Sequence, residues 1–316
     1  MISARNLTKR FGRITAVEHV SFEVGKGEIL GFIGPNGAGK TTSMRMLTGF
    51  LPCTEGEAVV AGHDVFEDPM AVRRAVGYLP ETPPLYPELS VGEYLEFIAE
   101  IREVPARERR QRVGEAMEGV GLVGWERRLL GSLSKGYRQR VGLAQTVLHN
   151  PAVLILDEPT SGLDPAQVVG IRDYIRSLAQ ERTVIVSTHI LTEVELLCRR
   201  AVVIAKGKLL ADDTLDGLRG RVGAGLRYRV ELGAPSDVHV ATEVSRLGEV
   251  ASVAPLEDRD GALLSQGLTA LELRAPEDPR TAVARLATQR GWTIRAMERV
   301  VPSLEEAFLS IVGSER

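Results

Sequence analysis

The residues with the clearest chemistry lie in one short glycine-rich segment, GPNGAGKTT, at residues 34–42. It fits the pattern G-x-x-x-x-G-K-[ST], whose glycines let backbone N–H groups turn inward without side-chain collisions. A helix that begins near Lys40 would present the positive end of its dipole to a phosphate chain. The Lys40 ammonium can then reach the β and γ phosphates, and the Thr41 hydroxyl can ligate Mg²⁺. The expected nucleotide-binding residues are Gly34, Pro35, Asn36, Gly37, Ala38, Gly39, Lys40, Thr41 and Thr42.

A glycine turn before an ordinary helix is the alternative for this segment. The flanking residues argue against it, because EILGFI before the loop predicts a strand and SMRMLTGF after it predicts a helix. Strand, loop and helix in that order are the context that phosphate binding needs. We therefore expect the chain to bind ATP together with Mg²⁺.

Two carboxylates follow an apolar run in VLILDEP, residues 153–159. Such a run is typical of a strand buried on both faces of a parallel sheet, and ligands bind at the carboxyl ends of these strands. Asp157 is thus placed to hold Mg²⁺, and Glu158 to orient or deprotonate the attacking water. Alone, the pair would indicate an acidic turn; beside a phosphate loop, it indicates hydrolysis. His189 ends TVIVSTH and is placed to contact the γ phosphate, although a histidine at a strand end is more often a turn residue.

Strands alternate with helices over the first two-thirds of the chain, which predicts a layered α/β fold. The expected strands are residues 1–8, 16–24, 28–33, 57–60 and 76–79, the runs AVLILDEP and TVIVSTH, and a hairpin in AVVIAKGKLLADD. The expected helices are residues 40–48, 91–146 with breaks at Pro105 and Gly131, 166–182 and 191–198. The long helical stretch, within about residues 82–146, has the character of an insertion into the α/β domain.

After about Gly220 the pattern changes to β-α-β-β-α-β and a last helix, which matches a split, ferredoxin-like unit. The expected strands there are residues 225–232, 250–257, 268–274 and 293–299, and the expected helices are 238–247, 281–290 and 303–312. The predicted domains are a nucleotide-binding domain at 1–215, a linker at 216–224 and an accessory or regulatory domain at 225–316.

Bulk composition excludes several classes of function. Hydrophobic residues make up 44% and charged residues 26%, and the net charge of -3 gives no overall attraction to nucleic acid, so no nucleic-acid partner is expected. Two cysteines, Cys53 and Cys198, without a CxxC pair, argue against a disulfide framework or a zinc site and favour a reducing compartment. The segment MISARNLTKRFG lacks the apolar core of a signal peptide, and no run of about 18 apolar residues predicts a membrane span.

A further motif gives the chain a specific resemblance. LSKGYRQR, residues 133–140, lies between the phosphate loop and VLILDEPTSGLD, and in this order the motifs resemble an ATP-binding cassette (ABC) ATPase over about two-thirds of the chain. The usual signature of that family is LSGGQ; here Lys135 and Tyr137 take its third and fifth positions, while Ser134 and Gly136 are kept. The resemblance implies a P-loop NTPase with a RecA-like core, an N-terminal β subdomain and an inserted helical subdomain, and it implies ATP hydrolysis.

The resemblance also implies further contacts with ATP. Ser134 and Gly136 would complete the site of a second subunit in a homodimer that sandwiches two ATP molecules head to tail, and Asp164 would cross that interface. Phe11 falls where the family stacks an aromatic ring on adenine, with a core position as the equally weighted alternative. Glu81 stands where the family usually carries Gln. Its carboxylate can ligate Mg²⁺ and take part in catalysis, but it adds negative charge near the phosphates.

A closer resemblance is to single-cassette proteins that serve a separate membrane exporter, including gliding-motility and multidrug types. YLPE, LSKGYRQRVGLAQ and PSLEEAFLSIVG carry it. It implies a peripheral protein on the cytoplasmic face of a membrane, where the loop TPPLYPELS and the helices after it receive an integral permease. Soluble ABC ATPases of translation or DNA repair are the alternatives; the former usually join two cassettes, and the latter split theirs with a coiled coil that this sequence does not predict.

Overall fold

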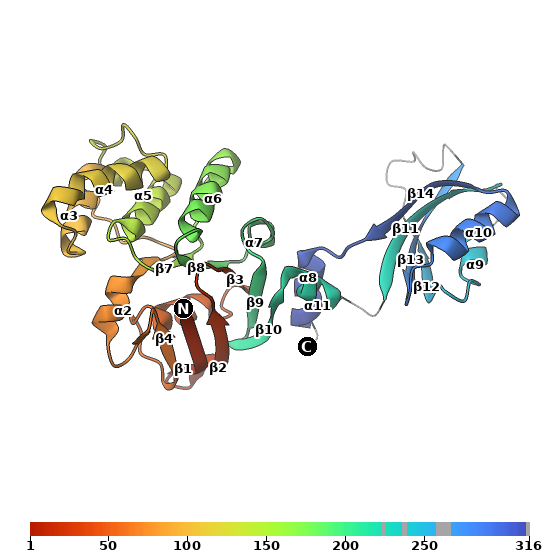
Figure 1. The fold of residues 1–316 in the computed structure, drawn as a ribbon, viewed down its shortest axis with the longest axis horizontal. Coiled ribbons are helices and arrows are strands. Elements are labelled where there is room, and N and C mark those ends of the chain that lie inside the picture. Colours follow the sequence, from red (N-terminus) through yellow and green to blue (C-terminus); the bar gives the residue numbers. More distant parts are fainter. Residues whose placement is uncertain (223–224, 236–238, 257–266, 314–316) are drawn as a thin grey trace. The chain divides into compact units, whose positions relative to one another are not determined.

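The computed structural model describes residues 1–222, 225–235, 239–256 and 267–313 (Figure 1). The chain divides into two compact units, one formed by Met1–Leu218 with the segment from Ile311, the other by Arg219–Ser310. Residues 216–220 of the predicted linker are part of a helix, α8 (Leu215–Gly220), while residues 223–224 lie outside the described residues.

Two sheets build the first unit. An antiparallel sheet has the strand order β2-β1-β4-β5, and a six-stranded sheet has the order β10-β9-β3-β8-β7-β6. In the second sheet β9, β3, β8, β7 and β6 run parallel, and β10 pairs antiparallel with β9. The strands are β1 (Ile2–Phe11), β2 (Ile14–Val24), β3 (Ile29–Ile33), β4 (Glu55–Val60), β5 (His63–Asp64), β6 (Val76–Leu79), β7 (Val153–Asp157), β8 (Thr183–Thr188), β9 (Arg200–Ala205) and β10 (Lys208–Thr214). This arrangement confirms the predicted α/β fold.

The apolar strand runs form the core of this unit. Every residue of β7 and β8 is buried, as their lack of polar alternation predicted. The core continues into the antiparallel sheet: the ring centroid of Phe22 in β2 lies 5.4 Å from that of Phe32 in β3. A side chain at Gly31 of β3 would collide with Val194, because a Cβ there would lie 2.7 Å from Val194 Cγ1. The central strand is thus held close to the helix that follows β8.

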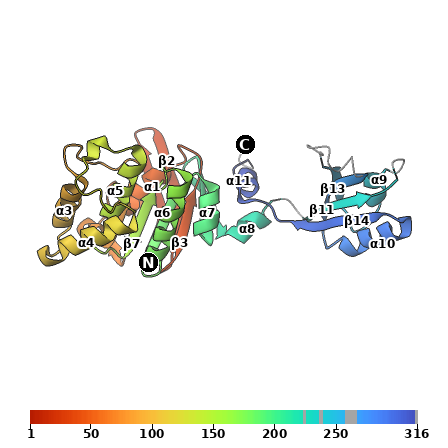
Figure 2. The same ribbon diagram turned by 90° about the horizontal axis from the view of Figure 1, so that it is seen from above.

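Helices flank the parallel sheet, and Figures 1 and 2 show α3, α4 and α5 gathered on one side of it. The helices are α1 (Lys40–Leu47), α2 (Pro69–Ala75), α3 (Val91–Ile101), α4 (Ala106–Gly119), α5 (Lys135–Val147), α6 (Pro165–Ala179) and α7 (Leu191–Leu197). The expected break at Pro105 is confirmed, since this residue caps α4. The break expected at Gly131 is longer in the structure than predicted. Between α4 and α5 only the short 3-10 turn Leu130–Ser132 is helical.

The second unit contains a four-stranded antiparallel sheet of order β12-β13-β11-β14. Its elements follow as β11 (Leu226–Gly233), α9 (Val240–Val244), β12 (Ser252–Pro255), β13 (Leu268–Ala275), α10 (Arg280–Arg290) and β14 (Thr293–Val300), and α11 (Leu304–Gly313) comes after them. This is the expected β-α-β-β-α-β order, although Val238 and Glu257, at the expected ends of a helix and a strand, lie outside the described residues. Trp292 and Tyr228 are buried in the core of this unit.

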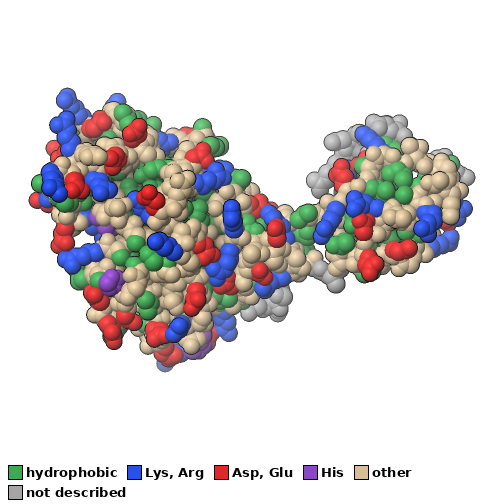
Figure 3. All heavy atoms as spheres, viewed as in Figure 1, with side chains coloured by type: hydrophobic (Ala, Val, Ile, Leu, Met, Phe, Trp, Pro, Cys, Tyr) green, Lys and Arg blue, Asp and Glu red, His purple; other side chains and the backbone are tan. Residues whose placement is uncertain are grey.

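The surface carries both signs of charge. On the face seen in Figure 3, acidic and basic side chains are interspersed with apolar ones. Among the helices of the described ranges, none has both the length and the apolar character that a membrane crossing requires.

Candidate active site

The phosphate loop joins β3 to α1, and its geometry requires glycine at two positions. A Cβ at Gly34 would lie 2.3 Å from the Ile204 carbonyl oxygen, so no side chain fits there. Gly39 has a φ of 103°, a left-handed conformation that other residues rarely adopt, and a Cβ there would lie 2.6 Å from the Ala16 carbonyl. No side chain caps α1, so the N–H groups of its first turn can donate hydrogen bonds to an anion.

Lys40 is the first residue of α1 and is 7% exposed. Its ammonium donates hydrogen bonds to the carbonyl oxygens of Gly34 (2.7 Å) and Pro35 (3.2 Å), which leaves one of its three N–H donors for a phosphate oxygen. Burial lowers the pKa of Lys40, and the nearby carboxylates of Glu158, Asp157 and Glu81 oppose that shift. A buried ammonium gains stability when an anion binds beside it, so this lysine is suited to hold phosphate.

Asp157 ends β7 and is 1% exposed. Its two carboxylate oxygens accept hydrogen bonds from two hydroxyls, Oδ1 from Ser187 and Oδ2 from Thr41, each at 2.7 Å. The contact with Thr41 joins the end of β7 to the first turn of α1. Hydroxyl and carboxylate oxygens are ligands that Mg²⁺ prefers, so the chemistry of this pair fits the ion.

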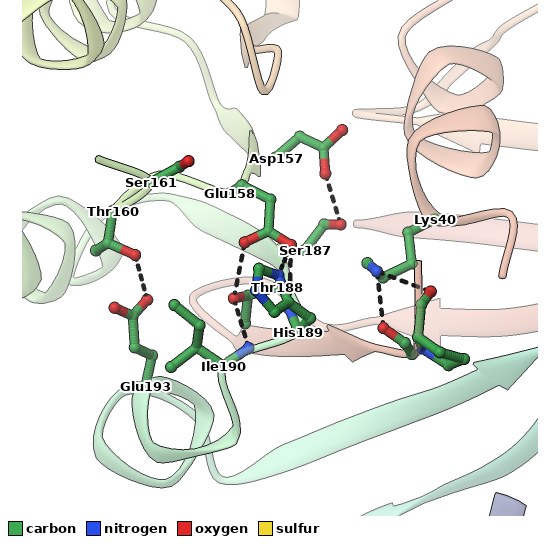
Figure 4. Close-up of polar contacts among 12 residues, drawn as sticks. Lys40, Asp157, Glu158, Thr160, Ser161, Ser187, Thr188, His189, Ile190 and Glu193 are labelled. Atoms are coloured by element: carbon green, nitrogen blue, oxygen red, sulfur yellow. Dashed lines mark hydrogen bonds and ion pairs between the residues drawn. The ribbon is translucent and has the colours of Figure 1, made fainter. Parts of the chain in front are cut away.

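Glu158 is the next residue, and it is held by Thr188, the last residue of β8, and by His189 after it (Figure 4). Its Oε1 accepts hydrogen bonds from the His189 backbone N–H (3.1 Å) and from His189 Nδ1 (2.7 Å), and its Oε2 accepts one from the Thr188 hydroxyl (3.2 Å). Glu158 is 6% exposed, whereas the His189 side chain is 53% exposed. A carboxylate fixed by three donors is suited to orient a water molecule.

These groups line one cavity of about 410 Å³. Its predicted members are Asn36, Gly37, Ala38, Gly39, Lys40, Thr41, Thr42, Glu81, Asp157, Glu158 and His189, and Ala16 is an unpredicted one. Sequence reasoning also missed Ser187 and Thr188, which fix the two carboxylates. The polar ending of the otherwise apolar run TVIVSTH was a signal that could have identified them.

The other predicted residues lie outside the lining of this cavity. Ser134 is exposed and caps α5, and Asp164 is exposed and caps α6. Gly136 is buried at the start of α5, where a Cβ would lie 2.7 Å from the Gly162 carbonyl. Phe11 is 48% exposed at the end of β1, so the core alternative for it is wrong.

An aromatic pair supports the start of α5. The ring of Tyr137, at the fifth position of the signature, stacks on Trp125 with centroids 4.0 Å apart and planes 24° from parallel. Arg128 lies over the Trp125 ring and Arg140 over the Tyr137 ring. These contacts join the segment before α5 to the first turn of that helix, whose exposed N-cap is Ser134.

Comparison with known proteins identifies families that this chain resembles. A family model described as "ABC transporter" matches residues 17–161. A second model, described as "AAA domain, putative AbiEii toxin, Type IV TA system", matches residues 128–195.

Two curated relatives are similar along nearly their whole length. The uncharacterized ABC transporter ATP-binding protein YhcH of Bacillus subtilis is 34% identical, over 100% of this chain and 97% of its own. The daunorubicin resistance ATP-binding protein DrrA2 of Streptomyces coeruleorubidus is 33% identical, over 99% and 95% of the two chains. Among solved structures, the ATP-binding cassette MJ0796, a dimer in a post-hydrolysis state with ADP and Pi, superposes with a TM-score of 0.63 at 25% identity, over 68% of this chain and 98% of that one.

Proposed function

This chain belongs to the family of ABC transporter ATP-binding proteins, and we propose that it powers export through a separate membrane permease. Binding and hydrolysis of ATP follow from the family. The single observation that carries ATP hydrolysis as the source of power is the cavity in which the phosphate loop meets Asp157, Glu158 and His189. A relative named for daunorubicin resistance, similar over 99% of this chain, supports export as the direction of transport.

In the proposed reaction the residues of this cavity have different roles. Lys40 and the first-turn amides of α1 hold the phosphates, and Glu158 orients the attacking water and takes its proton. With Nδ1 directed at Glu158, His189 keeps Nε2 available for the γ phosphate or the water. Mg²⁺ would be held by Thr41, Asp157 and Glu81, and when bound it supplies positive charge to the phosphate oxygens.

Glu81 lies in the loop after β6, is exposed, and lines the same cavity. If it acts as a metal ligand, Glu81→Gln should keep ATP turnover within about threefold of the unsubstituted chain, because an amide oxygen also ligates Mg²⁺. Glu81→Ala removes the ligand and should lower turnover further than Glu81→Gln does. Steady-state ATPase rates across a Mg²⁺ titration measure both effects. Equal rates for Glu81→Ala and the unsubstituted chain would remove Glu81 from the site.

The proposed active form is a homodimer. Ser134 and Gly136 lie outside the cavity of their own chain. Ser134 is the exposed N-cap of α5, and the amino end of a helix can bind a phosphate group. We place them against the ATP of the second subunit, with Asp164 at the same interface and Phe11 on the adenine. The dimeric cassette with ADP and Pi, similar to this chain, supports this assembly.

The proposed permease site is a groove of about 610 Å³ between α2, β6 and α3. Large apolar side chains line it and are exposed, namely Phe50, Met70 and Ile101. Arg73 and Arg102, also in its lining, donate to the main-chain carbonyls of Gly49 and Arg73 rather than to carboxylates. The groove therefore suits a cytoplasmic helix of the permease with an apolar face and an acidic side chain. Tyr86, in the predicted contact loop TPPLYPELS, packs its ring against Phe97 of α3, the helix that also contributes Ile101 to the groove. Such a complex would place the chain on the cytoplasmic face of the membrane.

Purification from detergent-solubilised membranes of the native cell tests this function. A permease should co-purify with the tagged chain as one protein with about six apolar membrane-spanning segments. Ile101→Asp should abolish that capture while leaving the ATPase rate of the isolated chain within about twofold, because a charge in an apolar contact is costly. Val123→Asp, at a position 68% exposed and outside the groove, is the control and should keep the capture. Recovery of ribosomes or DNA-repair proteins instead of a membrane protein would overturn the proposal.

A further inference from the structure

The backbone of Glu158 adopts a conformation that is unfavourable for its residue type. Its φ is +50°, in the left-handed region that favours glycine. Residues persist in this region only where their surroundings hold them, and such residues concentrate at functional sites. On the amide side, the Glu158 N–H donates to the Ser187 carbonyl of β8 at 2.8 Å.

On the carbonyl side, the holding group comes from a different element. The Glu158 carbonyl accepts a hydrogen bond from the Ser161 N–H at 3.1 Å and another from Gln139 Nε2 at 3.0 Å. Gln139 lies in the second turn of α5 and is 1% exposed. Its side chain lies outside the lining of the ATP cavity, so its contact with the site is through the Glu158 backbone.

The first turn of α5 contacts the same segment. The Lys135 ammonium donates to the Ser161 hydroxyl at 3.0 Å. Gly136 packs so closely on the Gly162 carbonyl that a Cβ would lie 2.7 Å from its oxygen. Residues 158–162 therefore contact the first two turns of α5 at three points.

We propose that Gln139 is a positioning residue for ATP hydrolysis, which fixes the left-handed backbone of Glu158 and joins it to the helix that carries Ser134. This inference rests on the proposed roles of Glu158 and of Ser134 across a dimer. Its consequence is that one rigid helix connects the two ATP sites. When Ser134 engages the ATP of the second subunit, a displacement of α5 reaches the carboxylate that orients water in its own chain.

Gln139→Met tests the hydrogen bond, because it keeps the length of the side chain and removes its donor. We expect kcat for ATP to fall about tenfold or more, since small misplacements of a catalytic group are costly. KM and the affinity for ATP should stay within about threefold, because Gln139 does not touch the cavity. In a Glu158→Gln background, ATP-dependent dimerisation should also be retained.

Gln145→Met is the matched control. Gln145 lies six residues further along α5, and its side-chain oxygen accepts a hydrogen bond from the Tyr94 hydroxyl at 2.5 Å. This variant also loses one side-chain hydrogen bond of the same helix, and we expect its kcat to stay within about twofold.

Gln139→Glu separates positioning from a loss of packing. Burial and the neighbouring Glu158 should raise the pKa of the introduced carboxyl. When protonated it can donate to the Glu158 carbonyl, and when ionised it repels that oxygen. The ratio of its kcat to that of the unsubstituted chain should therefore rise several-fold from about pH 8 to about pH 6, whereas the ratio for Gln139→Met should stay flat.

A kcat within about twofold for Gln139→Met would overturn the inference, as would equal, pH-independent losses in the Met and Glu variants. A different result would show that the proposed dimer itself is wrong: both the unsubstituted chain and the Glu158→Gln variant would then stay monomeric with ATP.

Discussion

Glu158→Gln is expected to lower steady-state ATP turnover about a hundredfold or more, the usual scale for loss of a general base. Glutamine keeps the shape of the side chain, and its carbonyl oxygen can still accept from the Thr188 hydroxyl or the His189 N–H, which hold the glutamate now. It cannot take a proton from water. ATP affinity should stay within a few-fold, because the phosphates are held by Lys40 and the first turn of α1.

A second buried carboxylate provides the control for this substitution. Glu193 of α7 accepts a hydrogen bond from the Thr160 hydroxyl at 2.6 Å (Figure 4). It is not among the residues that line the cavity. Burial raises the pKa of Glu193, so the neutral amide in Glu193→Gln is a mild change. The rate of ATP turnover of the Glu193→Gln variant should remain within about threefold of that of the unsubstituted chain. If Glu158→Gln also lost less than about threefold, another group would have to activate the water.

Ser134→Arg is expected to abolish the ATP-dependent dimer. In the Glu158→Gln background, where hydrolysis is blocked, the chain should be a monomer without nucleotide and a dimer with ATP. Each γ phosphate then gains charge-assisted donors from across the interface. Arginine at the exposed N-cap of α5 would put bulk where that phosphate docks, while ATP binding to the monomer should barely change. Light scattering at high protein concentration, with and without ATP, measures the dimer.

Ser134→Arg also removes a helix cap, which by itself costs about 1 kcal/mol. Ser90→Arg is the matched control, because Ser90 likewise caps a helix, α3, by accepting from the Glu93 N–H, and it is not one of the signature residues 134–136. This variant should keep the dimer. If Ser134→Arg instead removed ATP binding to the monomer, the signature would serve the site of its own chain.

The phosphate loop and the acidic strand end were predictable because local sequence determines them. Gly34 and Gly39 lie where a Cβ would collide with main-chain carbonyls, and the buried strand β7 delivers Asp157 to the same edge of the sheet as β3. The helix α2 was missed because its seven residues contain too little periodicity, although Asp68 caps it and Pro69 begins it.

Gln139 could not be identified from the sequence. A glutamine in a helical stretch has no spacing rule that marks it as buried, and its partner is a main-chain carbonyl nineteen residues away. The left-handed backbone of Glu158 was equally invisible, since tertiary contacts impose it against the preference of the residue.

The division into two compact units has a spectroscopic consequence. The chain contains two tryptophans, Trp125 and Trp292, and each unit holds one of them. Trp125 lies against the Tyr137 ring beside the start of α5, whereas Trp292 is 8% exposed in the core of the second unit. With Trp292→Phe, the remaining indole emission reports on the surroundings of α5 alone. With Trp125→Phe, it reports on the second unit alone, so the melting of each unit can be followed without an added dye.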